Sequence, residues 1–340
     1  MIARGLLVPR ARGEEVRNDL ADSGLLRPDL AILRDGDSLV LPITDTPEGV
    51  PPSWGELVER DFKEYPRKAP AHYRDLLAWP ESEKELLPRS FDIVGDVVLI
   101  RLPAELVPRR EAIGEALLRF VPGARLVGID HGVHGPERRR KVERIAGSGS
   151  WRTRHKENGV ELEVDLERAY FSPRLAREHA RVAEEVRVGE RVYDLCCGVG
   201  PFSATIAHVG RAERVTAVDS NPDAIALLRE TLARHAFGGR VAPVGSSLEE
   251  FLPGATPVER VVLNLPHEGI KYLPSVARTV TARGRLYYYE VTPRTELAER
   301  GVALVNSLAP VGKFALVNGR VVHPYSPGSD LVAFELERAG

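Results

Sequence analysis

The chain is poor in cysteine, methionine and aromatic residues, and it contains no apolar run that approaches a membrane span. Its 340 residues include two cysteines, one methionine and 6% aromatic residues. The cysteines, Cys196 and Cys197, are adjacent; such pairs rarely close a disulfide and lack zinc-ligand spacing. A transmembrane helix needs roughly 18 apolar residues, and Met1–Arg10 lacks a signal-peptide cleavage pattern. We therefore expect a soluble protein of two or three domains in the reducing cytoplasm, without metal, membrane contact or internal repeats.

The chain also lacks the excess of positive charge that is typical of nucleic-acid-binding proteins, because its net charge is -2. The distribution is uneven, however: residues 137–158 contain eight Lys/Arg and three Glu. A segment with that excess suits a phosphate backbone, and we predict that Lys141, Arg152 and Arg154 contact RNA. A merely solvated basic surface is the alternative.

Proline-rich and charged stretches divide the chain into three predicted parts, 1–70, 71–164 and 165–340. The first begins as strand, helix and strand, and a loop follows at Thr46–Pro52. Residues 53–88 have the mixed charge of a helical segment. The second part reads as a small mixed α/β module, with strand signals at Phe91–Ile100 and Ala124–Gly128 and a helix at Arg109–Phe120.

Strand and helix signals alternate regularly after residue 190. This pattern predicts a parallel, doubly wound α/β sheet, and the two final strands predict a closing antiparallel hairpin. The predicted strands are Val192–Leu195, Arg214–Val218, Val241–Val244, Arg260–Leu263, Arg285–Val291, 313–321 and 330–337, and the helices are Pro201–Val209, Asn221–His235, Ile270–Thr281 and Arg294–Leu308.

A glycine motif lies where the first of these strands meets its helix. Gly198 and Gly200 allow the backbone to approach a ligand closely. Asp194 precedes them, where a carboxylate can bind an ammonium, and Asp219 ends the next strand, where an acidic residue can hold a ribose. The third glycine of a dinucleotide-binding motif is missing, which favours S-adenosylmethionine, a ligand without pyrophosphate. A tight structural turn is the alternative.

Asn264 and Pro266 follow the fourth strand of this part. The amide of Asn264 offers both a donor and an acceptor to a planar base, and Pro266 fixes the turn. Ligands of such sheets bind at the carboxyl ends of the strands. The same residues could simply end a strand.

These motifs belong to a wider resemblance that spans nearly the whole chain. The sequence resembles the archaeal and eukaryotic tRNA (guanine-37-N1)-methyltransferase family and its wybutosine-pathway relatives. The resemblance implies a class I methyltransferase sheet preceded by two small α+β domains, which contact the outer corner and the anticodon arm of tRNA. The matching stretches are Ser90–Ile100, Arg138–Gly147, His155–Gly159, Tyr170–Leu175, Asp194–Ser203, Asp219–Ala224 and Val261–Pro266.

The resemblance also implies roles for individual residues. The family's general base falls on Glu178, its catalytic arginine on Arg138 and its base-holding asparagine on Asn264. Such a set suits the chemistry, since guanine N1 must lose a proton to become a nucleophile and an arginine can stabilise the charge that moves to O6. The predicted cofactor contacts are Arg174, His179, Asp194, Cys196, Gly198, Gly200, Asp219, Ser220, Asn221, Ser247 and Asn264, and the predicted substrate contacts are Tyr170, Pro266, Lys141, Arg152 and Arg154.

Three features depart from the family pattern. Cysteines stand where an aromatic and a small residue are usual, Glu178-His179 replaces a frequent Glu-Arg pair, and Gly245-Ser246-Ser247 offers hydroxyls where an acidic residue usually faces the adenine. Three other functions stay open: aminocarboxypropyl transfer to a wyosine precursor, methylation of a wyosine intermediate, and tRNA binding without catalysis. We expect a monomer in which residues 165–340 bind the cofactor by themselves.

Overall fold

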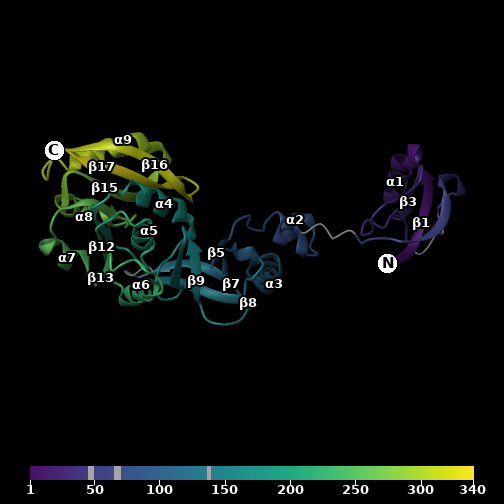
Figure 1. Ribbon diagram of the computed structural model, residues 1–340, viewed down its shortest axis with the longest axis horizontal. Coiled ribbons are helices and arrows are strands. Elements are labelled where there is room, and N and C mark those ends of the chain that lie inside the picture. The colour runs from purple at the N-terminus through teal and green to yellow at the C-terminus, as the bar shows by residue number, and fades with distance from the viewer. Residues whose placement is uncertain (45–49, 65–69, 136–138) are drawn as a thin grey trace. The chain divides into compact units, whose positions relative to one another are not determined.

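The computed structural model describes residues 1–44, 50–64, 70–135 and 139–340. The chain forms two compact units, Met1–Asp75 and Leu76–Gly340 (Figure 1). Arg138 lies outside the described residues.

The described residues of the first unit form a four-stranded sheet and one α-helix. Leu6, Val16 and Leu41 are fully buried between the sheet and the helix. The prediction that residues 53–88 are helical is wrong for Glu56–Asp61, which forms a strand that pairs with the first strand of the chain. Within the described part of this segment, only Glu81–Lys84 forms an α-helix. The sheet has the order β2-β3-β1-β4, and its elements are β1 (Ile2–Pro9), α1 (Gly13–Asp22), β2 (Leu33–Asp35), β3 (Ser38–Pro42) and β4 (Glu56–Asp61).

The second unit begins with a four-stranded sheet and a separate hairpin. The hairpin turns at Asn158 and Gly159, which both have positive φ (47° and 81°), as a tight two-residue hairpin turn requires. The sheet has the order β5-β6-β7-β8. The elements are α2 (Glu81–Lys84), β5 (Asp92–Val94), β6 (Val97–Ile100), α3 (Arg110–Phe120), β7 (Leu126–His134), β8 (Arg139–Gly147), and the hairpin strands β9 (Arg152–Glu157) and β10 (Val160–Asp165).

The rest of the second unit confirms the predicted doubly wound sheet. Its seven strands have the order β13-β12-β11-β14-β15-β17-β16; the first five are parallel, and β17 pairs antiparallel with both of its neighbours. The strands are β11 (Arg191–Leu195), β12 (Arg214–Asp219), β13 (Val241–Gly245), β14 (Val258–Leu263), β15 (Val280–Pro293), β16 (Phe314–Ser326) and β17 (Ser329–Arg338). The helices are α4 (Ala176–Glu185), α5 (Pro201–Val209), α6 (Pro222–Arg234), α7 (Leu248–Phe251), α8 (Gly269–Arg278) and α9 (Leu297–Ser307).

Helices cover both faces of this sheet, which explains why its central strands are nearly continuous apolar runs. Val182, Phe202 and Ile225 bring α4, α5 and α6 onto one face, while Leu273 and Leu304 bring α8 and α9 onto the other. In Figure 1 the strands and helices of this sheet run from teal and green to yellow, with β15, β16, β17 and α9 among the last in the chain.

The β9–β10 hairpin belongs to the core of this sheet as well. Val160, Leu162 and Val164 are fully buried in the same apolar cluster as Val182 and Phe202. The predicted boundary between residues 164 and 165 therefore passes through one shared hydrophobic core.

Candidate active site

A cavity of about 570 Å³ lies at the carboxyl ends of strands β11, β12, β13 and β14. This is the edge where doubly wound sheets bind their ligands. Predicted site residues from all four strand ends meet there, although they are far apart in the sequence. The predicted residues that line it are Tyr170, His179, Cys196, Gly198, Asp219, Ser220, Asn221, Ser247, Asn264 and Pro266.

The glycine motif forms a tight turn at the floor of this cavity. Cys196, Gly198 and Gly200 all have positive φ (60°, 56° and 77°), and the amide of Cys197 donates to Val218 O at 3.0 Å. A Cβ on Gly200 would come within 2.5 Å of Leu228 Cδ1. Gly200 does not line the cavity, so this glycine is required for packing, whereas Gly198 faces the ligand space.

The cysteines of this turn are buried thiols. Burial is the main cause that raises the pKa of both Cys196 and Cys197 above the ordinary value. The thiols therefore stay protonated, which makes them packing groups and poor nucleophiles.

Asp219 connects the glycine turn to the second strand. Its Oδ2 accepts a hydrogen bond from the amide of Gly198 at 2.7 Å, and its Oδ1 accepts one from Asn221 N at 2.8 Å. The Asn221 side chain caps α6, accepting from Asp223 N, and donates to Arg168 O. Asp219 thus shapes the cavity wall directly, whereas the amide of Asn221 is occupied by the cap.

Asp194 lies beneath the turn and does not line the cavity. Its Oδ2 accepts hydrogen bonds from Ser203 N at 3.0 Å and Ser203 Oγ at 2.6 Å. Its Oδ1 is buried and has no hydrogen-bond partner among the described residues. Burial raises the pKa of this carboxyl to about 6. An ammonium at the cavity floor would compensate for this buried charge.

His179 reaches the cavity from α4. Its Nδ1 lies 2.6 Å from Oε1 of Glu157, on the neighbouring hairpin, and both side chains are buried. The sequence contains Glu157 within the matching stretch His155–Gly159, but its partnership with a helix residue further along the chain could be found only from the fold.

Asn264 and Pro266 line the cavity on the side of β14, and Tyr170 lines it from the segment before α4. The Pro266 carbonyl accepts from Val291 N at 3.2 Å, which fixes the turn after the strand. The guanidinium of Arg140 lies 5.3 Å from the centre of the Tyr170 ring, a cation–π contact that holds this ring in place.

The cavity wall that follows β13 holds one carboxylate more than the sequence indicated. Ser247 caps α7, and its Oγ accepts from Glu250 N at 3.2 Å. A carboxylate that the sequence analysis missed, Glu249, also lines the cavity and accepts from the Tyr272 hydroxyl. The structure therefore places a carboxylate at the cavity two residues after Ser247, within α7.

Glu178 does not line the cavity. It is 2% exposed, and its carboxylate accepts hydrogen bonds from Tyr289 Oη at 2.6 Å, from Arg181 at 2.8 Å and from Arg320. Burial alone would raise the pKa of Glu178, but these three donors outweigh it and lower the pKa. The carboxylate is therefore ionised at neutral pH. Arg174, a predicted cofactor contact, also lies outside the cavity lining and pairs with Asp92 at 2.8 Å.

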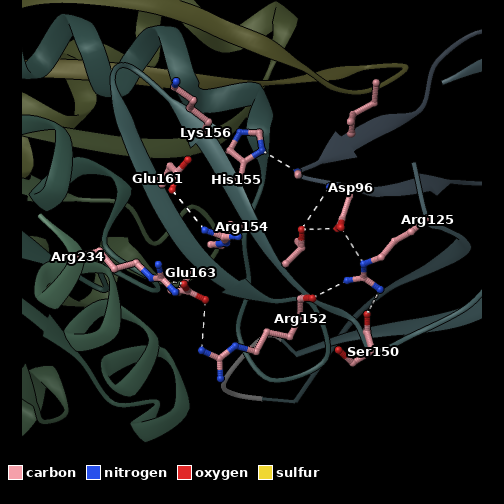
Figure 2. Close-up of a pocket in the computed structure, with 13 residues that line it drawn as sticks. Asp96, Arg125, Ser150, Arg152, Arg154, His155, Lys156, Glu161, Glu163 and Arg234 are labelled. Carbon is pink, nitrogen blue, oxygen red and sulfur yellow. Dashed lines mark hydrogen bonds and ion pairs between the residues drawn. The ribbon is translucent and has the colours of Figure 1, made fainter. Parts of the chain in front are cut away.

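The predicted RNA-contacting arginines line a second, open basin of about 900 Å³ (Figure 2). Figure 2 shows that carboxylates face these arginines. Arg152 pairs with Glu163 at 3.3 Å, Arg154 with Glu161 at 3.7 Å, and Arg234 with Glu163 at 2.7 Å. The positive charge of this surface is thus partly neutralised by Glu161 and Glu163, which lie outside the segment 137–158 whose charges were counted in the sequence. Lys141 is exposed on β8 and lies outside the basin lining.

None of the helices in the described part of the chain has the length and apolar character needed to span a bilayer.

Comparisons with known proteins agree with this geometry. Residues 153–317 match the TRM5/TYW2 methyltransferase domain, residues 73–150 the TYW2 N-terminal domain, and residues 5–51 the tRNA methyltransferase 5 N-terminal domain. The chain is 32% identical to the tRNA (guanine(37)-N(1))-methyltransferase Trm5b of Pyrococcus abyssi, over 96% of this chain and 97% of that protein.

Solved structures give the same result. The crystal structure of Trm5b from Pyrococcus abyssi superimposes with a TM-score of 0.76 and 30% identity, covering 99% of this chain and 100% of that one. The complex of aTrm5 and tRNALeu superimposes with a TM-score of 0.75 and 29% identity, covering 98% and 99%.

Proposed function

Because the chain belongs to the tRNA (guanine(37)-N(1))-methyltransferase family, we propose that it methylates N1 of guanosine 37 in tRNA with S-adenosylmethionine. One observation supports this above the others. A single cavity is lined by the glycine turn and Asp219, which suit a nucleoside cofactor, and by Asn264 and Tyr170, which suit a planar base. Cofactor and target base can therefore meet in one space.

The cofactor end of the cavity suits S-adenosylmethionine in charge as well as shape. Gly198 leaves backbone space, Asp219 offers carboxylate oxygens for the ribose hydroxyls, and Asp194 Oδ1 is a buried acceptor without a partner among the described residues. Glu249 and Ser247 are the polar groups for the adenine edge. When bound, the cofactor supplies an electrophilic methyl group on a sulfonium.

The base end is formed by side chains that orient a purine. Asn264 offers an amide donor and acceptor, and Pro266 fixes the turn that presents it. The Tyr170 ring, supported by Arg140, offers a stacking surface. These residues would hold the guanine edge with N1 toward the cofactor end.

Glu178 is the proposed general base and Arg138 the proposed stabiliser of the negative charge on guanine O6. The lowered pKa of Glu178 keeps it in the form that accepts a proton. Because Glu178 is buried and does not line the cavity, this role requires its carboxylate to become accessible in the tRNA complex and to exchange a present donor for guanine N1–H. Catalytic hydrogen bonds often become aligned only in the substrate complex.

We assign tRNA contacts to the first two predicted parts, 1–70 and 71–164, and to Lys141, Arg152 and Arg154. The matches of two separate N-terminal domain families to residues 5–51 and 73–150 support this division. Because carboxylates already pair with Arg152 and Arg154, phosphates would have to compete with these partners. We also propose that the protein works in the reducing cytoplasm, which its buried thiols fit. We propose that it is a monomer.

Aminocarboxypropyl transfer remains the second candidate, because residues 73–150 match the N-terminal domain of a wyosine-pathway relative. The match of residues 5–51 to the tRNA methyltransferase 5 N-terminal domain favours methylation. The test incubates either unmodified tRNA or tRNA that carries a wyosine intermediate with cofactor labelled in the methyl group or in the carboxyl group.

Methyl label recovered as 1-methylguanosine at position 37 would support the proposal. Transfer of the carboxyl label would establish the second candidate. Methyl transfer only to tRNA that already carries a wyosine intermediate would establish that activity instead, and transfer of neither label would leave a tRNA-binding protein. A tRNA with adenosine at position 37 is the matched substrate control.

A further inference from the structure

Two ring side chains, those of His267 and Tyr325, lie together at the base end of the cavity. Both line it, and His267 directly follows Pro266 in the chain, while Tyr325 lies near the end of β16. His267 Nε2 lies 2.9 Å from the Tyr325 hydroxyl oxygen, and the two rings meet edge to face with their centroids 5.4 Å apart. The Tyr325 side chain is therefore held both at its hydroxyl and at its ring.

The exposure of Tyr325 sets it apart from the other aromatic residues. It is 45% exposed, and within the described ranges it is the only Phe, Trp or Tyr whose side chain is classed with the surface. A single exposed apolar residue is ordinary by itself. A ring that is fixed by a neighbour and lines a ligand cavity, however, offers a prepared flat surface to another ring.

The charges around these rings favour a nucleobase over a phosphate group. Lys271 is the only Lys or Arg of the described chain that lines the cavity, and it pairs with Glu268 at 2.9 Å. A phosphate group is recognised by cations that are available to it. A base needs only a flat partner, and unpaired bases of RNA stack on aromatic side chains through their π faces.

We propose that Tyr325 stacks on a nucleobase next to guanosine 37, at position 36 or 38, and that His267 positions the Tyr325 ring. This rests on the proposed function, since it takes guanosine 37 as the target. A nucleotide that enters the cavity keeps its covalent neighbours at the rim, where the exposed ring lies. The stack would align the RNA strand so that the target guanine enters between Asn264 and the cofactor end.

The test is a double-mutant cycle between the ring and the flanking bases. Methylation kcat/KM is measured on intact tRNA, on tRNA abasic at position 36 and on tRNA abasic at position 38. On intact tRNA, Tyr325→Ala should lower kcat/KM about 5- to 100-fold, the scale of one lost base–aromatic stack. On the substrate that lacks the stacked base, the same substitution should change kcat/KM by less than about twofold. The full loss should persist on the other abasic substrate, which identifies the position.

Two further variants complete the experiment. Tyr325→Phe keeps the ring and removes only the hydroxyl contact with His267, so it should lose about two- to fivefold on intact tRNA, the scale of a neutral hydrogen bond. Val317→Ala is the matched control, because Val317 is also exposed on β16 but lies outside the cavity lining. It should match wild type on all three substrates. Calorimetric affinity for S-adenosylmethionine should be unchanged in every variant, which also shows that each is folded.

Other results would overturn the inference. An equal loss on all three substrates would assign the ring to guanosine 37 itself or to packing, and an unchanged kcat/KM in Tyr325→Ala would remove it from the RNA site. Weaker cofactor binding by Tyr325→Ala would place the ring at the cofactor instead. If wild-type protein methylated no guanosine 37 in intact tRNA, the proposed function itself would fail.

Discussion

Glu178→Gln separates the chemical role of this residue from its structural one. The carboxylate is 2% exposed and accepts from Arg181, Tyr289 and Arg320. A charged hydrogen bond contributes about 1.5–3 kcal/mol. Arg181 keeps Glu335 as a partner at 2.7 Å, so the substitution should cost about 2–3 kcal/mol. At about 2–4 °C per kcal/mol, the melting temperature should fall by about 5–10 °C.

The expected effect on catalysis is larger than instability alone explains. If Glu178 accepts the N1 proton, methyl transfer should fall at least about a hundredfold at neutral pH, the usual scale for loss of a general base. Cofactor affinity should barely change, because Glu178 does not line the cavity. The assay is single-turnover methylation of tRNA at a temperature well below the melting transition of the variant.

Glu335→Gln provides the matched control from the same ionic network. Glu335 is buried and pairs with Arg181 and, at 3.7 Å, with Arg320. Burial outweighs these partners and raises its pKa, so neutralising it should cost little stability. Its methylation rate should remain within a few-fold of wild type. Near-normal turnover of Glu178→Gln, or an equal loss of rate in both variants, would refute the assignment of the base.

Three further variants test the cofactor end and the proposed RNA surface. Asp219→Ala should weaken S-adenosylmethionine binding by about 1.5–3 kcal/mol, and an unchanged dissociation constant by calorimetry would dismiss the ribose assignment. Neutralising Lys141, Arg152 and Arg154 together should flatten the log–log salt dependence of tRNA affinity by about 0.7–0.9 for each lost phosphate contact; equal slopes in filter binding would place the docking surface elsewhere. Asp194→Asn should raise the melting temperature of the cofactor-free protein near neutral pH. Because burial raises the pKa of Asp194 from 3.8 to about 6, the cost of its charge applies above about pH 6 and is absent below about pH 4. The gain should therefore vanish as the pH falls through this window, and a gain independent of pH would contradict the reasoning.

The sequence was most informative where structure is set locally. The strands β11, β12 and β14 are short and largely apolar, and the helix Pro201–Val209 was predicted with its observed bounds. The helical prediction for residues 53–88 was wrong at β4, which forms a strand by pairing with β1, about fifty residues earlier in the chain. Mixed charge without clear periodicity carried no sign of that partner.

The site residues also fall into those that local sequence located and those that only the fold brings together. Gly198, Asp219 and Asn264 lie at or just after the ends of strands, so the rule that ligands bind at strand ends located them. The pairing of Glu157 with His179, and the contacts of Tyr289 and Arg320 with Glu178, join elements that are distant in the chain. Side-chain direction on α4 decides the difference, since neighbouring residues Glu178 and His179 point to the ionic network and to the cavity respectively.

The predicted second part, residues 71–164, contributes to the cavity and not only to the proposed tRNA contacts. Val133 and Gly135 line the cofactor cavity, and Glu157 holds His179. Arg140 lies over the Tyr170 ring and donates to Phe171 O at 2.8 Å. A fragment of residues 165–340 would lose these contacts together with the buried strand β10, so we no longer expect it to bind cofactor by itself. Removing residues 1–75, by contrast, leaves the larger compact unit whole, and that truncation should keep cofactor affinity while weakening tRNA binding. The predicted second part, 71–164, therefore lines and supports the cavity in addition to its proposed contacts with tRNA.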